Sequence, residues 1–314
     1  MTKVSIVIPC YFNELNIPET YTVLKQDVLN KRSDIDFELI FVDDGSRDKT
    51  LDELKKIQKM DGRIKIIKLS RNFGEFRAIV AGMSQATGEA IAVMSADLQD
   101  PPYLITDMIK FWESGERVVI AARNKRDEPW IKNFFANTYY KIVRKLVIAD
   151  YPKQGFDFFL IDRQVVDILV NMQEKNSSIY VQLIWTGFKP KVIEYTRQAR
   201  EKGQSMWSYK KRIDLFIDTF IVFSHTPIRW ISVLGFLMSI SGFISAIFFI
   251  YDKLVHGSDV AGWTSLMVVV LVLAGVQMIM LGIIGEYMWR NLDESRKRPL
   301  YIIDEVIEGG KKNG

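Results

Sequence analysis

Short apolar stretches and longer amphipathic stretches alternate along the first 122 residues of the chain. The short stretches predict buried strands, because brief apolar runs bounded by turn residues suit a sheet that is covered on both faces. These strands are expected at Val4–Pro9, Phe37–Val42, Ile64–Leu69, Ala90–Ser95 and Arg117–Ala122. The amphipathic stretches predict helices at Asn16–Leu29, Lys49–Gln58, Phe76–Ala86 and Leu104–Ser114. Such alternation indicates an α/β domain with a mostly parallel sheet.

Two long stretches without any charged residue follow nearer the C-terminus. Trp230–Tyr251 contains 22 uncharged residues and Val260–Gly285 contains 26. At ~1.5 Å rise per residue, each is long enough to cross ~30 Å of hydrocarbon as a helix. Buried core helices of a soluble protein would show a polar face, and these stretches show none. We therefore predict two transmembrane helices. Their glycines favour close packing of helices, either within one chain or between chains of a homo-oligomer.

Positive charges flank the two apolar stretches unequally. The connection between the stretches holds one lysine, Lys253. The outer flanks carry Lys210, Lys211, Arg212, Arg229, Arg290, Arg296, Lys297 and Arg298. The positive-inside rule therefore predicts that both termini are cytoplasmic. The chain also enters its first strand directly, without the apolar core of a signal peptide, so we expect a domain that is not exported.

A third membrane-related feature precedes the first apolar stretch. Apolar residues between Lys210 and Phe223 follow the spacing of one helical face behind a basic cluster, which predicts an amphipathic helix in the headgroup layer. The predicted organisation is a cytosolic α/β domain over residues 1–205, an interfacial helix over 206–228, a two-helix transmembrane domain over 229–286 and a cytosolic tail over 287–314.

Composition narrows the chemistry that the α/β domain can carry. The chain has 314 residues, a net charge of +4, one cysteine and two histidines. A single cysteine excludes an internal disulfide, and the cysteine and histidines are too few for an ordinary zinc site. The net charge is modest and the sequence contains no patterned basic domain, so we expect no nucleic acid partner. Any metal must be held by carboxylates, amides and phosphates.

Polar residues gather where the predicted strands end. These ends hold Pro9–Glu14, Asp43-Asp44 and Asp97–Gln99, and ligands of parallel sheets bind beyond the carboxyl ends of the strands. Asp97 and Gln99 offer hard oxygen ligands that, with substrate phosphates, would hold Mg²⁺ or Mn²⁺. Asp43 and Asp44 can accept hydrogen bonds from ribose hydroxyls or a base edge. The sequence has no Walker A loop and no GxGxxG fingerprint, which weakens NTPase and dehydrogenase interpretations.

Four motifs in this order resemble family 2 glycosyltransferases of the GT-A fold. They are Ile8-Pro9-Cys10-Tyr11-Phe12-Asn13-Glu14, Val42-Asp43-Asp44-Gly45-Ser46, Arg71-Asn72-Phe73-Gly74 and Ala96-Asp97-Leu98-Gln99-Asp100-Pro101-Pro102. The chain is most similar to the polyprenyl-phosphate, dolichol-phosphate-mannose-synthase-like group and its bacterial GtrB-type branch. Later segments agree with that branch in order, and they include Gly155-Phe156-Asp157-Phe158 and Arg298-Pro299-Leu300-Tyr301.

The resemblance implies roles for individual residues. Pro9, Tyr11, Glu14 and Asp43 would form the nucleoside pocket, and Asp97 and Gln99 would bind the metal that bridges the donor diphosphate. Asp157 would be the catalytic base or the group that orients the acceptor, on a loop near the anomeric carbon. Anionic phosphates would contact Arg123, Arg126, Arg200 and Ser205. Ser95 stands where some relatives carry another aspartate, which implies sparser metal coordination.

The resemblance also implies a reaction. We expect an inverting transferase of the bacterial plasma membrane that moves a hexose from a nucleotide sugar, with UDP favoured, to a polyprenyl phosphate such as undecaprenyl phosphate. The product would serve modification of cell-envelope glycans. A transporter or flippase component and a non-catalytic nucleotide-sugar-binding scaffold remain the alternatives. The apolar stretches lack the central charged residues that transport pathways usually need.

Overall fold

The computed structural model describes residues 1–123, 144, 152, 155–172, 174–175, 177–196, 226–256 and 262–308. The chain divides into two compact units. One contains the N-terminal sheet together with the chain after Pro299, and the other contains two long helices. Arg126, Arg200, Ser205 and the predicted interfacial helix up to residue 225 lie outside the described residues.

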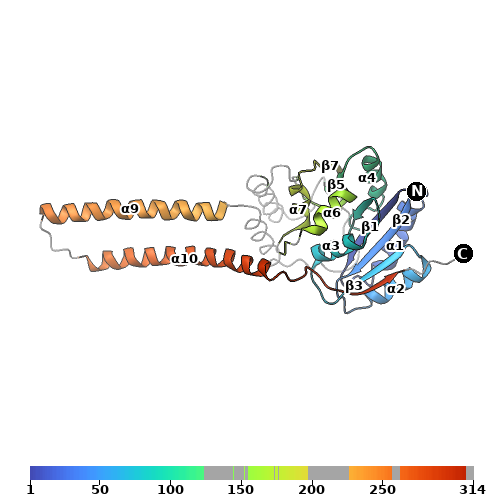
Figure 1. Ribbon diagram of the computed structural model, residues 1–314, viewed down its shortest axis with the longest axis horizontal. Coiled ribbons are helices and arrows are strands. Elements are labelled where there is room, and N and C mark those ends of the chain that lie inside the picture. The colour runs from blue at the N-terminus through green and yellow to red at the C-terminus, as the bar shows by residue number, and fades with distance from the viewer. Residues whose placement is uncertain are drawn as a thin grey trace. The chain divides into compact units, whose positions relative to one another are not determined.

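The first unit is built on an eight-stranded sheet with the order β7-β5-β6-β4-β1-β2-β3-β8 (Figure 1). The strands are β1 (Lys3–Cys10), β2 (Asp36–Asp43), β3 (Ile64–Leu69), β4 (Ala90–Val93), β5 (Val118–Arg123), β6 (Phe156–Asp162), β7 (Lys191–Tyr195) and β8 (Ile303–Glu308). β1 pairs in parallel with β2 and β4, and β2 with β3, while β6 and β8 run antiparallel to their neighbours. This mostly parallel, Rossmann-like sheet confirms the α/β prediction.

Helices cover both faces of this sheet. They are α1 (Ile17–Leu24), extended by a π-helical turn η1 (Lys25–Leu29), α2 (Thr50–Met60), α3 (Glu75–Gln85), α4 (Leu104–Glu113), α6 (Arg163–Asn171) and α7 (Ile179–Trp185). Val4, Ile6 and Ile8 of β1 share a buried cluster with α1, α2 and α4. The alternate residue Val7 lies on the opposite face, where a side chain at Gly82 of α3 would come within 2.4 Å of it. The period of two therefore buries both sides of β1.

The C-terminal segment is part of the sheet. β8 pairs antiparallel with β3, the Ser70 N–H donates to the Ile302 carbonyl at 3.0 Å, and Lys68 pairs with Asp304 at 2.5 Å. The sequence predicts residues 287–314 as one cytosolic tail, and within that range Ile303–Glu308 forms a strand. Its pattern of half-buried and exposed residues is that of an edge strand, which only pairing with β3 makes ordered.

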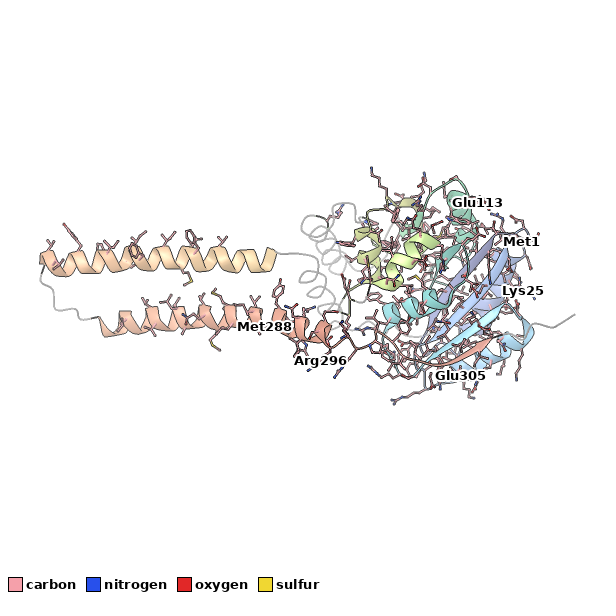
Figure 2. The ribbon with its side chains drawn as sticks, in the orientation of Figure 1. Met1, Lys25, Glu113, Met288, Arg296 and Glu305 are labelled. Carbon is pink, nitrogen blue, oxygen red and sulfur yellow. The ribbon has the colours of Figure 1, made fainter. Side chains whose placement is uncertain are left out.

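The second unit consists of α9 (Thr226–His256) and α10 (Trp263–Ser295), which lie side by side. A side chain at Gly235 of α9 would lie 3.4 Å from Met280 of α10, so small residues allow a close approach there. Figure 2 labels Met288 and Arg296 near the C-terminal end of α10. Among the described residues, one helical segment, Val272–Ser295, is long and apolar enough to cross a membrane, and a shorter apolar segment, Gly235–Ser245, lies in α9.

Candidate active site

One end of each of the eight strands lies at one edge of the sheet, which we call the site edge. The register pairs Cys10 of β1 with Asp43 of β2, and Val7 of β1 with Val93 of β4. Because β6 runs in the opposite direction, its first residues reach the same edge as the last residues of β4. β5 and β7 also end there, with Arg123 next to Tyr195 in the parallel register. The fold thus brings most of the predicted site residues to the site edge.

Asp43 is the most enclosed of the predicted nucleotide-binding residues, with 1% of its surface exposed. Its Oδ1 accepts the Ser46 N–H at 3.0 Å, whereas its buried Oδ2 has no hydrogen-bond partner among the described residues. Burial raises the pKa of Asp43, and the hydrogen bond from Ser46 acts in the opposite direction. A buried acceptor atom without a partner is unusual in a folded protein, and Oδ2 is chemically able to accept a donor from a ligand.

Asp44, the next residue, is hydrogen-bonded to a neighbouring loop. Its two carboxylate oxygens accept the N–H groups of Phe73, at 2.7 Å, and Gly74, at 2.9 Å. Burial is the main cause that raises its pKa, and these two hydrogen bonds oppose that shift. Gly45 has φ +70°, and a side chain there would come within 2.5 Å of the Arg71 carbonyl carbon. Asp44 and Gly45 therefore hold the Arg71–Gly74 loop against the end of β2.

The loop after β1 is joined to the start of α2. Glu14 accepts the Lys49 N–H through Oε2 at 2.9 Å, and the Asn13 N–H donates to the Thr50 hydroxyl at 2.9 Å. Tyr11 and Glu14 are half-buried, and Pro9 lies at the end of β1. These contacts and the pairing of Cys10 with Asp43 hold the Pro9–Glu14 segment beside Asp43.

The predicted metal residues follow β4 in a tight turn. Leu98, between them, has φ 55°, a left-handed conformation that non-glycine residues rarely adopt. The Gln99 N–H donates to Asp97 Oδ1 at 3.3 Å, and the Ser95 hydroxyl donates to the same oxygen at 2.7 Å. A strained residue between two candidate ligands is typical of functional turns. Ser95 thus supports the Asp97 carboxylate.

The donor set at this turn fits a hard divalent cation. In the part of the chain that the structure describes, no three His, Cys, Asp or Glu side chains are grouped to hold a metal. Asp97 and Gln99 are both half-buried and supply one carboxylate and one amide oxygen. Mg²⁺ prefers few protein ligands and takes the remainder from substrate phosphates and water. Mg²⁺ or Mn²⁺ held jointly with a diphosphate is consistent with this sparse set.

Arg123 and Asp157 form an ion pair at the site edge. The Arg123 Nη2–H donates to Asp157 Oδ2 across the ends of β5 and β6. Asp157 is the second residue of β6, so our prediction that it lies on a loop was wrong. The glycine before Phe156 suggested a loop, but pairing of β6 with β4 and β5 decides the conformation. Arg123 Nε is buried without a hydrogen-bond partner among the described residues, which leaves one donor for an anion.

Tyr195 and Asp100 complete the site edge. Asp100 belongs to the fourth sequence motif, whereas the sequence alone did not single out Tyr195. The Tyr195 hydroxyl at the end of β7 donates to Asp100 Oδ1. Asp100 Oδ2 lies 3.5 Å from the Ser95 hydroxyl that supports Asp97. Burial and the Asp100 charge raise the pKa of Tyr195, and Arg123 opposes the shift. A tyrosine at a strand end has no pattern that distinguishes it from an ordinary core residue, so no sequence signal could have found this contact.

Comparison with known proteins identifies the family of the chain. The model of glycosyl transferase family 2 matches residues 5–170. An uncharacterised glycosyltransferase of Bacillus subtilis is 42% identical over 96% of this chain and 93% of its own. A prophage bactoprenol glucosyl transferase homologue of Escherichia coli is 33% identical over 97% of this chain and 99% of its own. Among solved structures, mannosyl-3-phosphoglycerate synthase from Rubrobacter xylanophilus is 16% identical, with a TM-score of 0.49 over 69% of this chain and 71% of its own. The family match and the two whole-length relatives show that the chain is a glycosyltransferase and belongs to glycosyltransferase family 2.

Proposed function

We propose that the protein is an inverting membrane glycosyltransferase that moves a hexose from a nucleotide sugar, UDP-linked by preference, to a polyprenyl phosphate. The observation that carries the proposal is the site edge, where Asp43, the Asp97–Gln99 turn and the Arg123–Asp157 pair lie together. The acceptor is supported by the E. coli relative, whose name describes a bactoprenol glucosyl transferase homologue and which matches along nearly the whole chain.

The donor nucleoside would lie at the β1–β2 side of the site edge. Asp43 Oδ2 is the buried acceptor for an N–H of the base or a ribose hydroxyl, and Pro9, Tyr11 and Glu14 would line the same pocket. Asp44 would act indirectly, since its oxygens hold the Arg71–Gly74 loop. A ligand N–H or O–H on Asp43 would satisfy the one orphaned oxygen of that carboxylate.

The donor diphosphate would lie over the β4 turn. Asp97 and Gln99 would hold Mg²⁺ or Mn²⁺ there, and the cation would neutralise charge on the departing nucleoside diphosphate. Ser95 and the left-handed Leu98 keep the two ligand side chains on one turn. Preorganised ligands cost little rearrangement when the charge develops.

The acceptor would attack near β5 and β6. A phosphate monoester has a second pKa of about 6, so its oxygen is largely ionised at neutral pH and needs little deprotonation. One acceptor oxygen bonds to the anomeric carbon while the bond to the donor diphosphate breaks, which inverts that carbon. Arg123 would contact the acceptor phosphate through its unpartnered Nε, and Asp157 would orient the reacting groups. Arg126, Arg200 and Ser205 remain predicted phosphate contacts.

The sheet itself supports two membrane crossings. β8 pairs with β3, so the chain after α10 must lie on the same side of any membrane as the N-terminal sheet. The number of crossings between β7 and β8 must therefore be even. Since α10 contains an apolar segment long enough to cross, α9 is the described helix that would provide the return crossing. The charged flanks then favour a cytoplasmic site edge.

Cysteine labelling in sealed vesicles tests this topology. Single cysteines are introduced at Ser114, Ser258 and Ser295 in a Cys10→Ser background. We expect the cysteines at 114 and 295 to be labelled from one side of the membrane and the cysteine at 258 from the other. Ser114 is exposed at the end of α4 and serves as the reference for the sheet. Labelling of all three positions from one side would mean that neither helix spans the bilayer.

A direct assay tests the proposed reaction. The full-length enzyme is incubated with Mn²⁺, undecaprenyl phosphate and, in turn, several UDP- and GDP-linked hexoses, and the lipid is analysed by mass. We expect one added hexose on the lipid and release of the nucleoside diphosphate. An unmodified lipid and an intact nucleotide sugar with every donor would favour the non-catalytic nucleotide-sugar-binding scaffold instead. Hydrolysis of the nucleotide sugar without any lipid product would contradict the proposed acceptor.

A further inference from the structure

A chain of polar contacts runs along the site edge from the metal turn to the far end of the sheet. Asp100 is fully buried and Tyr195 is 4% exposed. Tyr195 donates to Asp100 Oδ1, and Asp100 Oδ2 lies beside the Ser95 hydroxyl, which in turn donates to Asp97. A buried carboxylate is costly unless it accepts a hydrogen bond, and the Tyr195 hydroxyl supplies one that holds Asp100 in place against Ser95.

The two ends of this chain belong to distant strands. β4 and β7 are separated in the sheet by β6 and β5, which at ~4.8 Å per strand gives about 14 Å between them. The segment after β4 must therefore extend past the ends of β6 and β5 to bring Asp100 to Tyr195. Those two strands carry Asp157 and Arg123, and Arg123 is the register neighbour of Tyr195.

We propose that the Tyr195–Asp100 hydrogen bond is a latch that positions the Asp97–Gln99 turn relative to the Arg123–Asp157 pair. Tyr195 is then a positioning residue, which acts on the metal ligands through Asp100 and Ser95. This inference rests on the proposed function for its consequence, since the latched turn is the one that would hold the cation and the donor diphosphate. The latch itself is a property of the polypeptide.

The latch accounts for the strained conformation of the Asp97–Gln99 turn. Leu98 is held in a left-handed conformation, which costs free energy and persists only where surrounding contacts determine it. Asp97 precedes Leu98 and Asp100 follows it by two residues, and both have contacts to Ser95. Fixing Asp100 from β7 therefore restrains the strained turn from its C-terminal side, while β4 restrains it from the other.

Tyr195→Phe removes one hydroxyl and keeps the ring, so it tests the latch without leaving a large cavity. Tyr21→Phe is the matched control. Tyr21 lies on α1, and its buried hydroxyl also donates to a buried carboxylate, Asp61 Oδ2, at 3.0 Å. The first measurement is amide hydrogen exchange in the full-length, metal-free protein. We expect exchange at Asp97–Asp100 to quicken about tenfold in Tyr195→Phe and to remain at the wild-type rate in Tyr21→Phe.

The second measurement is direct binding of Mn²⁺ in the presence of UDP, followed by loss of the electron paramagnetic resonance signal of free Mn²⁺. Loss of a contact that orients metal ligands typically weakens metal affinity about tenfold or more. We expect that loss in Tyr195→Phe and wild-type affinity in Tyr21→Phe.

The outcomes separate the latch from the proposed function. Wild-type exchange at Asp97–Asp100 in Tyr195→Phe, or equal acceleration in both variants, would overturn the latch, because the effect would be absent or merely one of global stability. Faster exchange together with wild-type Mn²⁺ affinity would overturn its role in positioning the metal ligands. Failure of the wild-type protein to bind Mn²⁺ with UDP would count against the proposed function, while the exchange result would still decide whether the latch exists.

Discussion

Replacing Asp157 with asparagine is expected to lower kcat by about 100-fold or more while leaving donor affinity nearly unchanged. General acid–base groups typically contribute 10²- to 10⁴-fold, and the low end applies if the ionised acceptor phosphate needs little help as a nucleophile. Asparagine keeps the size of the side chain but removes the negative charge that pairs with Arg123. A fall in kcat without a change in donor binding is the pattern of a group that acts mainly in the transition state.

Asp162→Asn is the matched control, since it makes the same change at the other end of β6. Asp162 accepts hydrogen bonds from Trp112 Nε1 and the Gln164 N–H, remote from the site edge, so its variant should lower Tm and retain kcat. The measurements are steady-state kinetics with the lipid acceptor and the anomeric configuration of the product by NMR. An unchanged kcat in Asp157→Asn, or an α-linked product from an α-linked donor, would show that the assignment of Asp157 or of inversion is wrong.

Replacing Asp97 with asparagine is expected to abolish measurable turnover and to weaken donor binding. Asp97 supplies the one carboxylate among the two proposed metal ligands, and an amide is a much poorer ligand for a hard cation. Because the cation would join the protein to the diphosphate, binding of the nucleotide sugar should weaken together with catalysis. Chelation of divalent cations in the wild-type enzyme should have the same two effects, measured by product formation and by titration calorimetry with UDP.

Asp107→Asn on α4 provides the control for this change. Asp107 forms a surface ion pair with Lys110 at 2.9 Å, and such pairs contribute little to stability. Its variant should therefore match the wild type in turnover, donor affinity and response to chelation. Full activity of the wild type in excess chelator would remove the metal from the proposed mechanism.

Local sequence determined the parts of this protein that short-range patterns control. The apolar runs at β1–β3 and the amphipathic runs at α2–α4 agree with the structure to within about two residues at most ends. The clustering of Asp43 and Asp97 at one edge followed from the rule that parallel strands share a direction, which depends only on the alternation of strands and helices. Their motifs were sufficient to indicate the enzyme family, which the comparisons confirmed.

Tertiary structure decided the features that depend on which strands become neighbours. Asp44 is predicted from the sequence only as a nucleotide contact, and the fold shows in addition that its carboxylate oxygens accept backbone N–H groups from a loop 29 and 30 residues away. Asp157 lies in a strand because β6 pairs with β4 and β5. Tyr195 donates a hydrogen bond to Asp100, which is 95 residues away in the sequence. The polar segment Ile303–Glu308 forms the strand β8 because it pairs antiparallel with β3. These contacts are non-local hydrogen bonds between single residues, and a single residue carries no periodic pattern from which its partner could be predicted.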